Sequence, residues 1–333
     1  MKYTWNRNGG LAVLLLCGLA LTACGEGGGV SGGESRFLSI GSAPPGGAFF
    51  VVGGALAKVL QDYAGDDQWE VTAEATKGSL ENIRRLDNGG IELALANSAV
   101  TYFAVRGMDD WERPYPVQGL ITMAPNVMAF ITPESSGIEA MSDLAGRRVV
   151  VGVAGAGWEF FARPILAAHG LSYDDFTPLY NTQAGAVDML ADGSADAAFL
   201  GGAVPTASLV QATTSQDIRF IPFDEEAKST VVEQYPFYFP MVIPAGTYAG
   251  HEEDFPTLSF GSMHLIAHAD MSEKLAYSAT RTIYENREMV VAQHAAGRSI
   301  TESNVIRETG TPFHPGAIRY YREMGIWREQ DTR

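Results

Sequence analysis

The fold is decided by a strand, a loop and a helix at residues 36–63, which read RFLSIGSAPPGGAFFVVGGALAKVLQDY. A short apolar run bounded by Gly and Pro is typical of a strand, so residues 36–40 are predicted to form one. The Gly/Pro-rich residues 41–47 form a loop. Apolar residues recur at helical spacing in residues 49–63, which predicts an amphipathic helix. A strand that runs through a glycine loop into a helix is typical of an α/β domain.

The same order recurs in the middle of the chain. A strand is predicted at residues 149–153, a glycine loop at 154–157 and a helix at 158–169. About 300 residues exceed what one hydrophobic core usually holds, so two lobes are expected, each α/β, with a largely parallel sheet. The other predicted strands are 69–75, 91–96, 176–180, 197–200, 218–221, 239–243 and 258–269, and the other predicted helices are 79–86, 100–105, 141–148, 184–191, 205–212 and 272–291.

The loops at the strand ends hold the candidate ligand-binding residues. In an open α/β sheet a ligand binds outside the carboxyl ends of the strands, where helix N-termini offer N–H groups and a positive dipole end to an anion. Some of these residues could have a structural role instead of a binding role. Ser79 could be the N-cap of a helix, and Asn97 and Ser98 could be turn residues. The candidates are Gly47, Ala48, Phe49, Thr76, Lys77, Gly78, Ser79, Asn82, Asn97, Ser98, Gly155, Ala156, Gly157 and Trp158.

The first 35 residues are predicted to be a lipoprotein signal and a tether. Residues 1–23 combine a short basic start with an apolar run too short to span a bilayer, which is typical of a secretory signal. The run ends in LTAC (21–24), which resembles the lipobox of bacterial lipoproteins and implies cleavage before Cys24 and lipidation of its thiol. A plain signal peptide with a chance cysteine is the alternative. Residues 24–35, rich in Gly, Ser and Glu, suit a flexible tether.

Charge and cysteine content exclude several classes of protein. Removing Lys2 and Arg7 with the signal leaves 21 basic and 39 acidic residues, and this net charge of −18 repels nucleic acid. Cys17 lies inside the predicted signal and Cys24 is the lipidation site, so a cysteine nucleophile, a redox pair and a cysteine-ligated zinc site are excluded. No stretch after residue 24 approaches the length of a membrane helix, so a soluble body is expected.

The remaining motifs predict no cofactor, no metal and no catalytic residue. His264 and His268 are predicted to lie about 13 Å apart on one strand, which is too far to ligate one ion. His169 and His294 are expected at helix C-termini as surface caps. The glycines at 152–157 depart from the spacing of a dinucleotide-binding fingerprint.

Several separated segments carry a further resemblance. They are GGAFF (46–50), GGALA (53–57), EATKGSLEN (74–82), LALANS (93–98), VGVAGAG (151–157), DAAF (196–199), YPFY (235–238), IPAGTY (243–248) and HPGA (314–317). In this order they are similar to the TAXI family, the solute receptors of one branch of TRAP (tripartite ATP-independent periplasmic) transporters. The resemblance covers residues 36–325.

The resemblance implies a two-lobed periplasmic-binding-protein (Venus flytrap) fold with the ligand cleft between the lobes. It implies that residues 36–131 and 242–333 form lobe 1 and residues 132–241 form lobe 2. It also implies a monomeric receptor without catalytic activity, periplasmic or at the cell surface, and the lipobox-like segment at Cys24 predicts that this receptor is lipid-anchored to the membrane. Such a receptor captures a small organic anion, a carboxylate or an amino acid such as glutamate, and delivers it to the membrane subunits of a TRAP transporter.

The chain departs from the family pattern at both walls of the expected cleft. Hydroxyl residues are usual in the family where this chain has residues 43–45, Ala48, Phe49 and Trp158, and Lys77 stands where glycine is usual. Loss of donors and gain of apolar surface predict a ligand with one anionic group and an apolar or aromatic body.

Two of these residues have open alternatives. Lys77 either helps to hold a carboxylate or is a solvated loop lysine. Trp158 either faces the cleft or packs against Phe161 or Ile165 on its own helix. Two other functions also remain open, an exported lipoprotein hydrolase with scattered Ser, His and Asp, and a lipoprotein that acts as a sensory or assembly module.

Overall fold

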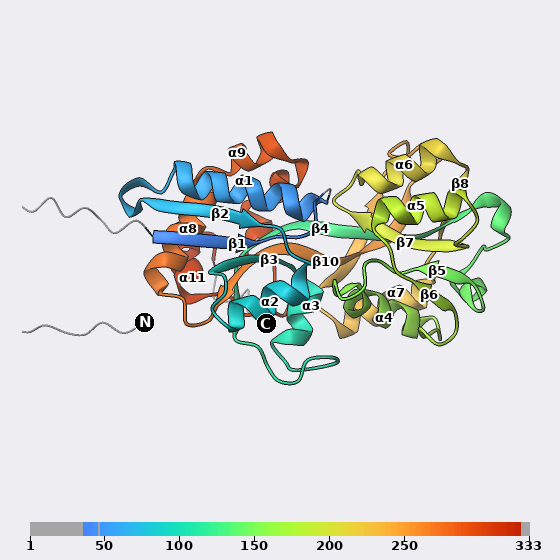
Figure 1. The fold of residues 1–333 in the computed structure, drawn as a ribbon, viewed down its shortest axis with the longest axis horizontal. Helices are drawn as coiled ribbons and strands as arrows, with labels where there is room; N and C mark the ends of the chain where they lie inside the picture. Colours follow the sequence, from blue (N-terminus) through green and yellow to red (C-terminus); the bar gives the residue numbers. More distant parts are fainter. Residues whose placement is uncertain (1–35, 46, 328–333) are drawn as a thin grey trace, which may run out of the picture. The chain divides into compact units, whose positions relative to one another are not determined.

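A mixed β-sheet runs through the computed structural model of the chain, which describes residues 36–45 and 47–327 (Figure 1). Its strands are β1 (Arg36–Gly41), β2 (Trp69–Glu74), β3 (Leu93–Asn97), β4 (Val117–Pro133), β5 (Arg148–Val150), β6 (Thr177–Leu179), β7 (Ala197–Gly202), β8 (Ile218–Ile221), β9 (Tyr238–Ile243) and β10 (Phe255–His268). They lie in the order β2-β1-β3-β10-β4-β7-β5-β6, with β8 beside β4 and β9 beside β10. The predicted signal 1–23, the lipidation site Cys24 and the tether 24–35 lie outside the described residues.

Helices cover both faces of this sheet. They are α1 (Ala48–Asp62), α2 (Ser79–Asp87), α3 (Ser98–Ala104), α4 (Trp158–Ala168), α5 (Gln183–Ala191), α6 (Ala207–Ser215), α7 (Glu225–Gln234), α8 (Glu273–Glu285), α9 (Arg287–Gln293), α10 (Glu302–Val305) and α11 (Pro315–Glu323), with short 3₁₀ turns at Gly65–Asp67, Glu134–Ser136, Met141–Leu144 and Ala295–Ser299. None of the described helices is both long and apolar enough for a membrane span.

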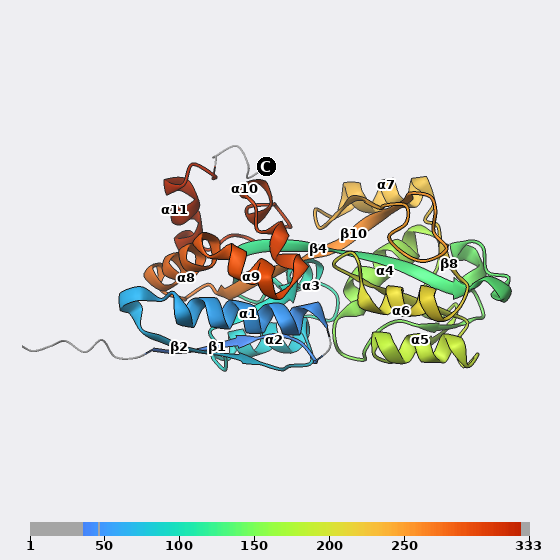
Figure 2. The ribbon, with the colours of Figure 1, turned by 90° about the horizontal axis from the view of Figure 1, so that it is seen from above.

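The sheet carries two lobes, which confirms the predicted two-lobed α/β fold. In the first lobe, α1, α8 and α9 pack on one face of β1, β2 and β3, and α2 and α3 pack on the other (Figure 1). In the second lobe, α5 and α6 lie on one face of β7 and β5, and α4 and α7 on the other (Figure 2). Each lobe therefore buries apolar side chains on both faces of its strands, as α/β folds do.

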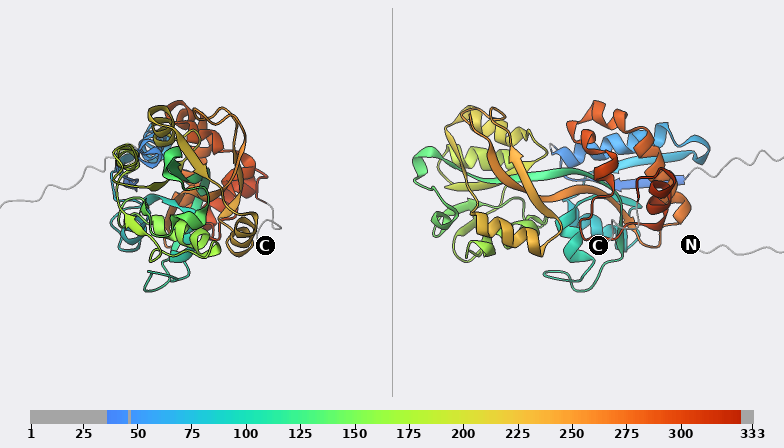
Figure 3. Two further views of the ribbon diagram at one scale, coloured as in Figure 1. Left: turned by 90° about the vertical axis from the view of Figure 1, so that its right-hand side faces the viewer. Right: turned by 180° about the vertical axis from the view of Figure 1, so that it is seen from behind.

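The long strands β4 and β10 connect the lobes. They pair antiparallel from His268↔Val117 to Ser259↔Val127, and Figure 3 shows them side by side. Beyond that point β4 pairs with β7 and β10 pairs with β9 in the second lobe. Both strands therefore pass from lobe to lobe without a break, and the lobe boundaries at 131/132 and 241/242 stay a prediction.

The predicted largely parallel sheet is wrong for the centre of the fold. Parallel pairs join β1 to β2 and β3, and β5 to β6 and β7, but β4 and β10 run antiparallel to every neighbour with which they pair. No strand was expected at β4, because its residues are buried almost throughout and show no alternation of apolar and polar side chains. Such a strand cannot be distinguished from other apolar runs by periodicity.

Three predicted helix features are also wrong in detail. The predicted helix at 272–291 is two helices, α8 and α9, which meet at Asn286. The N-cap of α2 is Gly78 rather than Ser79, whose hydroxyl accepts a hydrogen bond from the Asn97 N–H instead (3.0 Å). His169 does cap α4, but its ring is buried and not at the surface, because it bridges the Ile165 carbonyl and the Asp224 N–H.

Candidate functional site

A cavity of about 420 Å³ lies where the two lobes meet. Its first-lobe side consists of the loops that follow β1, β2 and β3, and its second-lobe side of the loops that follow β5, β6 and β7. Asn126 and Met128 of β4 contribute from the crossing between the lobes. The cavity therefore sits at the carboxyl ends of parallel strands, where ligands bind in open α/β sheets.

Helix N-termini converge on this cavity from both lobes. First-turn residues of α1, α2, α4, α5 and α6 belong to its lining. The first N–H groups of a helix have no partner within the helix, and side chains at the N-cap usually satisfy them. At α1, α2 and α4 the N-caps are Gly47, Gly78 and Gly157, which have no side chain, and at α6 the side chain of Thr206 makes no cap.

Of the helices that begin elsewhere in the fold, α7, α9 and α10 also start without a side-chain cap, whereas α8 and α11 have one. Ser272 caps α8 by accepting from the Leu275 N–H, and the His314 ring caps α11 by accepting from the Gly316 N–H. The uncapped starts of α1, α2, α4 and α6 thus leave N–H donors and positive dipole ends at the cavity. This arrangement favours an anion.

The walls of the cavity are largely apolar. Phe49 and Met128 line it together with Trp158 and Phe161 of α4. Among the described lining residues, Lys77 is the one with an ionisable side chain. It is exposed, and its ammonium group forms no salt bridge with the residues that the structure describes.

Most of the predicted site residues line this cavity, and the others lie outside its lining. The predicted residues in the lining are Gly47, Ala48, Phe49, Lys77, Gly78, Ser79, Asn97, Ala156 and Trp158. Those outside it are Thr76, Asn82, Ser98, Gly155 and Gly157. Ligand contact by any of these residues stays a prediction.

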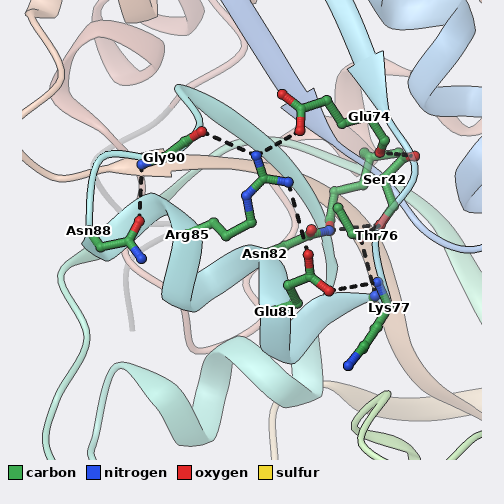
Figure 4. A network of polar contacts seen from close by, with 11 residues as sticks. Ser42, Glu74, Thr76, Lys77, Glu81, Asn82, Arg85, Asn88 and Gly90 are labelled. Atoms are coloured by element: carbon green, nitrogen blue, oxygen red, sulfur yellow. Dashed lines mark hydrogen bonds and ion pairs between the residues drawn. The ribbon is translucent and has the colours of Figure 1, made fainter.

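Buried hydrogen bonds explain where three of the outer residues lie. The Thr76 hydroxyl donates to the Ser42 carbonyl (3.1 Å), and the Asn82 amide donates to the same carbonyl (2.7 Å) and to that of Leu95 (2.8 Å) (Figure 4). The Ser98 hydroxyl accepts from the Ser262 N–H (2.8 Å). These side chains therefore position the loops that form the first-lobe wall.

Trp158 combines the two alternatives weighed for it. Its indole packs over Gly152 and lies 5.7 Å from the Phe161 ring and 6.1 Å from the Phe199 ring, between ring centroids. It nevertheless remains part of the cavity lining. The contact with Phe161 is thus confirmed, and the indole forms an apolar wall that its neighbours hold in place.

Several polar lining residues were not predicted from the sequence. Asn126 is 7% exposed, and none of the described residues hydrogen-bonds to its side chain. Gln183 is held by both Gly201 backbone groups and accepts from the Ser208 hydroxyl (2.6 Å). Thr182 and Gln211 complete the set. Asn126 lies within the unpredicted strand β4, and Gln211 lies inside the predicted helix 205–212. Thr182 and Gln183 directly precede the predicted helix 184–191, a position that could have identified them.

A second hollow of about 510 Å³ lies on the first lobe beside α9. It lies on one lobe alone, and its rim carries both Arg287 and Arg298 and both Glu288 and Glu302. The mixed charge selects no ligand class. Among residues 36–45 and 47–327, no group of three or more His, Cys, Asp or Glu side chains could hold a metal ion.

Comparison with known proteins gives a family and a fold. The model of the NMT1-like family matches residues 40–325. The chain is similar to a binding protein component of an ABC phosphonate transporter from Pseudomonas aeruginosa, with a TM-score of 0.53 and 10% identity over 78% of this chain and 79% of that one. A periplasmic sulfonate-binding protein from Methylobacillus flagellatus has a TM-score of 0.51 and 13% identity over 88% of each chain. A Xanthomonas citri protein bound to ATP has a TM-score of 0.51 and 11% identity over 90% and 100%.

Proposed function

This chain belongs to the NMT1-like family, and we propose that it is an extracytoplasmic solute-binding receptor that captures a small organic anion between its lobes. The observation that carries this proposal is the cavity at which uncapped helix N-termini of both lobes meet. N–H groups in fixed positions bind a carboxylate without help from the overall charge of the protein, which is negative. The two-lobed fold supplies walls that can close on the solute.

The partner is a transporter in the membrane. The sequence segments that are similar to those of TAXI receptors favour a TRAP transporter, so the partner would be its membrane subunits. Proteins of similar fold from Pseudomonas aeruginosa and Methylobacillus flagellatus are named as parts of ABC transporters. Uptake of the solute by vesicles that contain either kind of membrane subunit, with and without this protein, tests the assignment to TRAP.

The receptor is lipid-anchored through Cys24, in the periplasm or at the cell surface. The sequence around Cys24 supports this, because an apolar run followed by small residues and a cysteine is the substrate pattern of lipoprotein processing. Cys24→Ser should abolish labelling with palmitate and release the protein from the membrane fraction. Equal labelling of the variant and the wild type would contradict the anchor.

The proposed role includes no catalysis. Among the described residues no serine hydroxyl hydrogen-bonds to a histidine ring, and this pair is what activates a serine nucleophile. A turnover screen with ester and amide substrates distinguishes the receptor from an exported hydrolase. A lipoprotein that acts as a sensory module would bind solute equally well but would not support uptake.

Binding of an organic acid is the primary test. A thermal-shift screen should identify acids that raise the Tm, since a ligand at one hundred times its Kd adds about 2.7 kcal/mol to the free energy of unfolding. Lys77→Gln should weaken the best acid by about two- to fivefold at low salt and by less at high salt. Lys274→Gln is the control, because it removes the same charge from an exposed lysine that pairs with Asp67. A failure of every small solute to bind would contradict the receptor function.

A further inference from the structure

We infer that the solute carries one anionic group on an apolar body and has no ammonium group. The inference rests on the proposed receptor function and narrows its ligand class. It separates amino acids from organic acids that lack an amino group, because an amino acid and its desamino analogue differ only in that ammonium group. The charges, the buried amide and the apolar surface of the cavity each lead to it.

The described lining of the cavity offers no carboxylate to an ammonium group. None of the described lining residues is Asp or Glu. The carboxylate of Glu81 lies behind the lining, where it accepts from the Lys77 backbone N–H (3.0 Å) and lies 3.9 Å from an Arg85 nitrogen (Figure 4). The Lys77 side chain and the uncapped starts of four helices add positive potential at the same place. A buried ammonium would be repelled there and left without a counter-charge.

Donors for one anionic group come from buried side chains as well as from the backbone. The Asn126 amide is 7% exposed, belongs to the lining and has no partner among the described residues. Since no described group accepts from this amide, its N–H groups are available to an acceptor on a ligand in the cavity. Ser79 is also 7% exposed, and since its oxygen accepts from the Asn97 N–H, its own O–H remains free to donate.

The rest of the cavity suits an apolar body. Phe49 faces it from the start of α1, and Trp158 and Phe161 of α4 contribute aromatic surface from the other lobe. Met128 adds a flexible apolar side chain between them. A second carboxylate at this surface would lose its water without gaining donors, which penalises dianions.

Matched pairs of acids test the inference on the wild-type protein. Hydrocinnamate and phenylalanine, isocaproate and leucine, and glutarate and glutamate each differ by one amino group. Calorimetry should show hydrocinnamate or isocaproate binding about 100-fold more tightly than its amino partner, because the ammonium would be buried without a counter-charge. Each should also bind more tightly than glutarate. Tightest binding by phenylalanine, leucine, glutarate or glutamate would overturn the inference.

A charge change inside the cavity gives an independent test. Asn126→Asp should weaken the best monocarboxylate by about 100-fold through like-charge repulsion and should narrow its advantage over the amino partner. Asn88→Asp makes the same change at an exposed turn, where Asn88 accepts from the Gly90 N–H, and should leave affinity within about twofold. Circular dichroism and the ligand-free Tm establish whether the variants fold. If Asn126→Asp does not fold, the matched pairs of acids on the wild-type protein decide the question. Equal affinities of the two variants would also overturn the inference.

A wrong ligand class and a wrong receptor function give different experimental results. Mass spectrometry of solute released from the purified protein identifies the class of ligand directly. A released solute with an ammonium group or with two acid groups, which rebinds more tightly than the monocarboxylates, leaves a receptor and refutes its predicted ligand. If no acid of the panel binds and no solute is released, the receptor function itself fails.

Discussion

His264 lies in β10 with its ring buried, and its Nε2 is 2.8 Å from the hydroxyl oxygen of Thr101. That hydroxyl oxygen is also 2.8 Å from the hydroxyl oxygen of Thr311. No described carboxylate pairs with the ring, so burial disfavours its charged form and lowers the pKa of His264 to about 3. The imidazole is therefore a neutral packing and hydrogen-bonding group at neutral pH.

A buried neutral histidine makes stability depend on pH. The unfolded chain binds a proton near pH 6.5 and the folded chain only near pH 3, so the free energy of unfolding falls as pH falls through that window. At about pH 5 the contribution of His264 should be a loss of about 2 kcal/mol relative to about pH 7.5. His264→Gln, which keeps a hydrogen-bonding group beside Thr101, should show a shallower loss in urea titrations at these two pH values.

The control for this prediction is His268→Gln, since His268 ends the same strand with its side chain 26% exposed. This variant should keep the steep pH dependence of the wild type. Carboxylates remain largely ionised in this range, so they add little to the comparison. Equal slopes for His264→Gln and the wild type would contradict the assignment.

Among the elements, α2 is attached to the sheet by the buried amide of Asn82 and by an ion pair of Arg85. Asn82 donates to the carbonyls of Ser42, after β1, and of Leu95, in β3, and it is fully buried. Arg85 adds an ion pair with Glu74 of β2 (2.6 Å), which holds the pKa of that carboxyl below its usual range. The start of α2, which lines the cavity, is therefore oriented by the contacts that α2 makes with the sheet.

Asn82→Leu should lower the free energy of unfolding by about 2–4 kcal/mol, because the carbonyls of Ser42 and Leu95 each lose a buried hydrogen bond, although the Ser42 carbonyl keeps the one from Thr76. Urea denaturation measures this loss. Asn88→Ala, at the exposed turn that follows α2, should cost less than about 0.5 kcal/mol. Ligand affinity measured on the folded fraction should change much less than stability. A large loss of affinity with unchanged stability would instead assign Asn82 to the ligand.

At the scale of the whole molecule, the two lobes touch beside the cavity. A Cβ built on Gly78 would lie 3.5 Å from the Ala156 carbonyl oxygen of the other lobe. A Cβ built on Gly157 would collide with the Leu80 side chain and lie 3.1 Å from Val100. Glycine at these loops allows the lobes to approach as closely as they do.

Gly157→Ala should therefore hinder closure on the ligand. We expect the wild type to show a smaller radius of gyration in solution scattering when its acid is bound, and Gly157→Ala to show less compaction and at least about tenfold weaker binding. Gly155→Ala is the control, since Gly155 also has a positive φ (72° against 92° for Gly157) but no atom lies within 4 Å of its added Cβ. It should share only the backbone cost of about 1 kcal/mol. Binding to the wild type without compaction would argue for a rigid site, and equal compaction of both variants would contradict the role given to Gly157.

The local pattern of the sequence determined much of this protein. The strands and helices around residues 36–63 and 149–169 are present as predicted, because apolar periodicity and glycine loops are properties of neighbouring residues. The same reasoning brought the loops of both lobes to one site, since carboxyl ends of parallel strands meet at one edge of a sheet. The uncapped starts of α1, α2 and α4 also follow from glycines that are visible in the sequence.

Only the tertiary structure decided the centre of the molecule. The antiparallel strand β4, the buried and unpaired amide of Asn126 upon it, and the packing of Trp158 over Gly152 depend on residues far apart in the chain. A strand buried on both faces loses the alternation of apolar and polar residues that would identify it. Whether an amide side chain stays free for a ligand depends on which distant residues come within hydrogen-bond distance of it. Local sequence therefore specifies which loops surround the cavity, while long-range packing decides which donors and which apolar surfaces face its ligand.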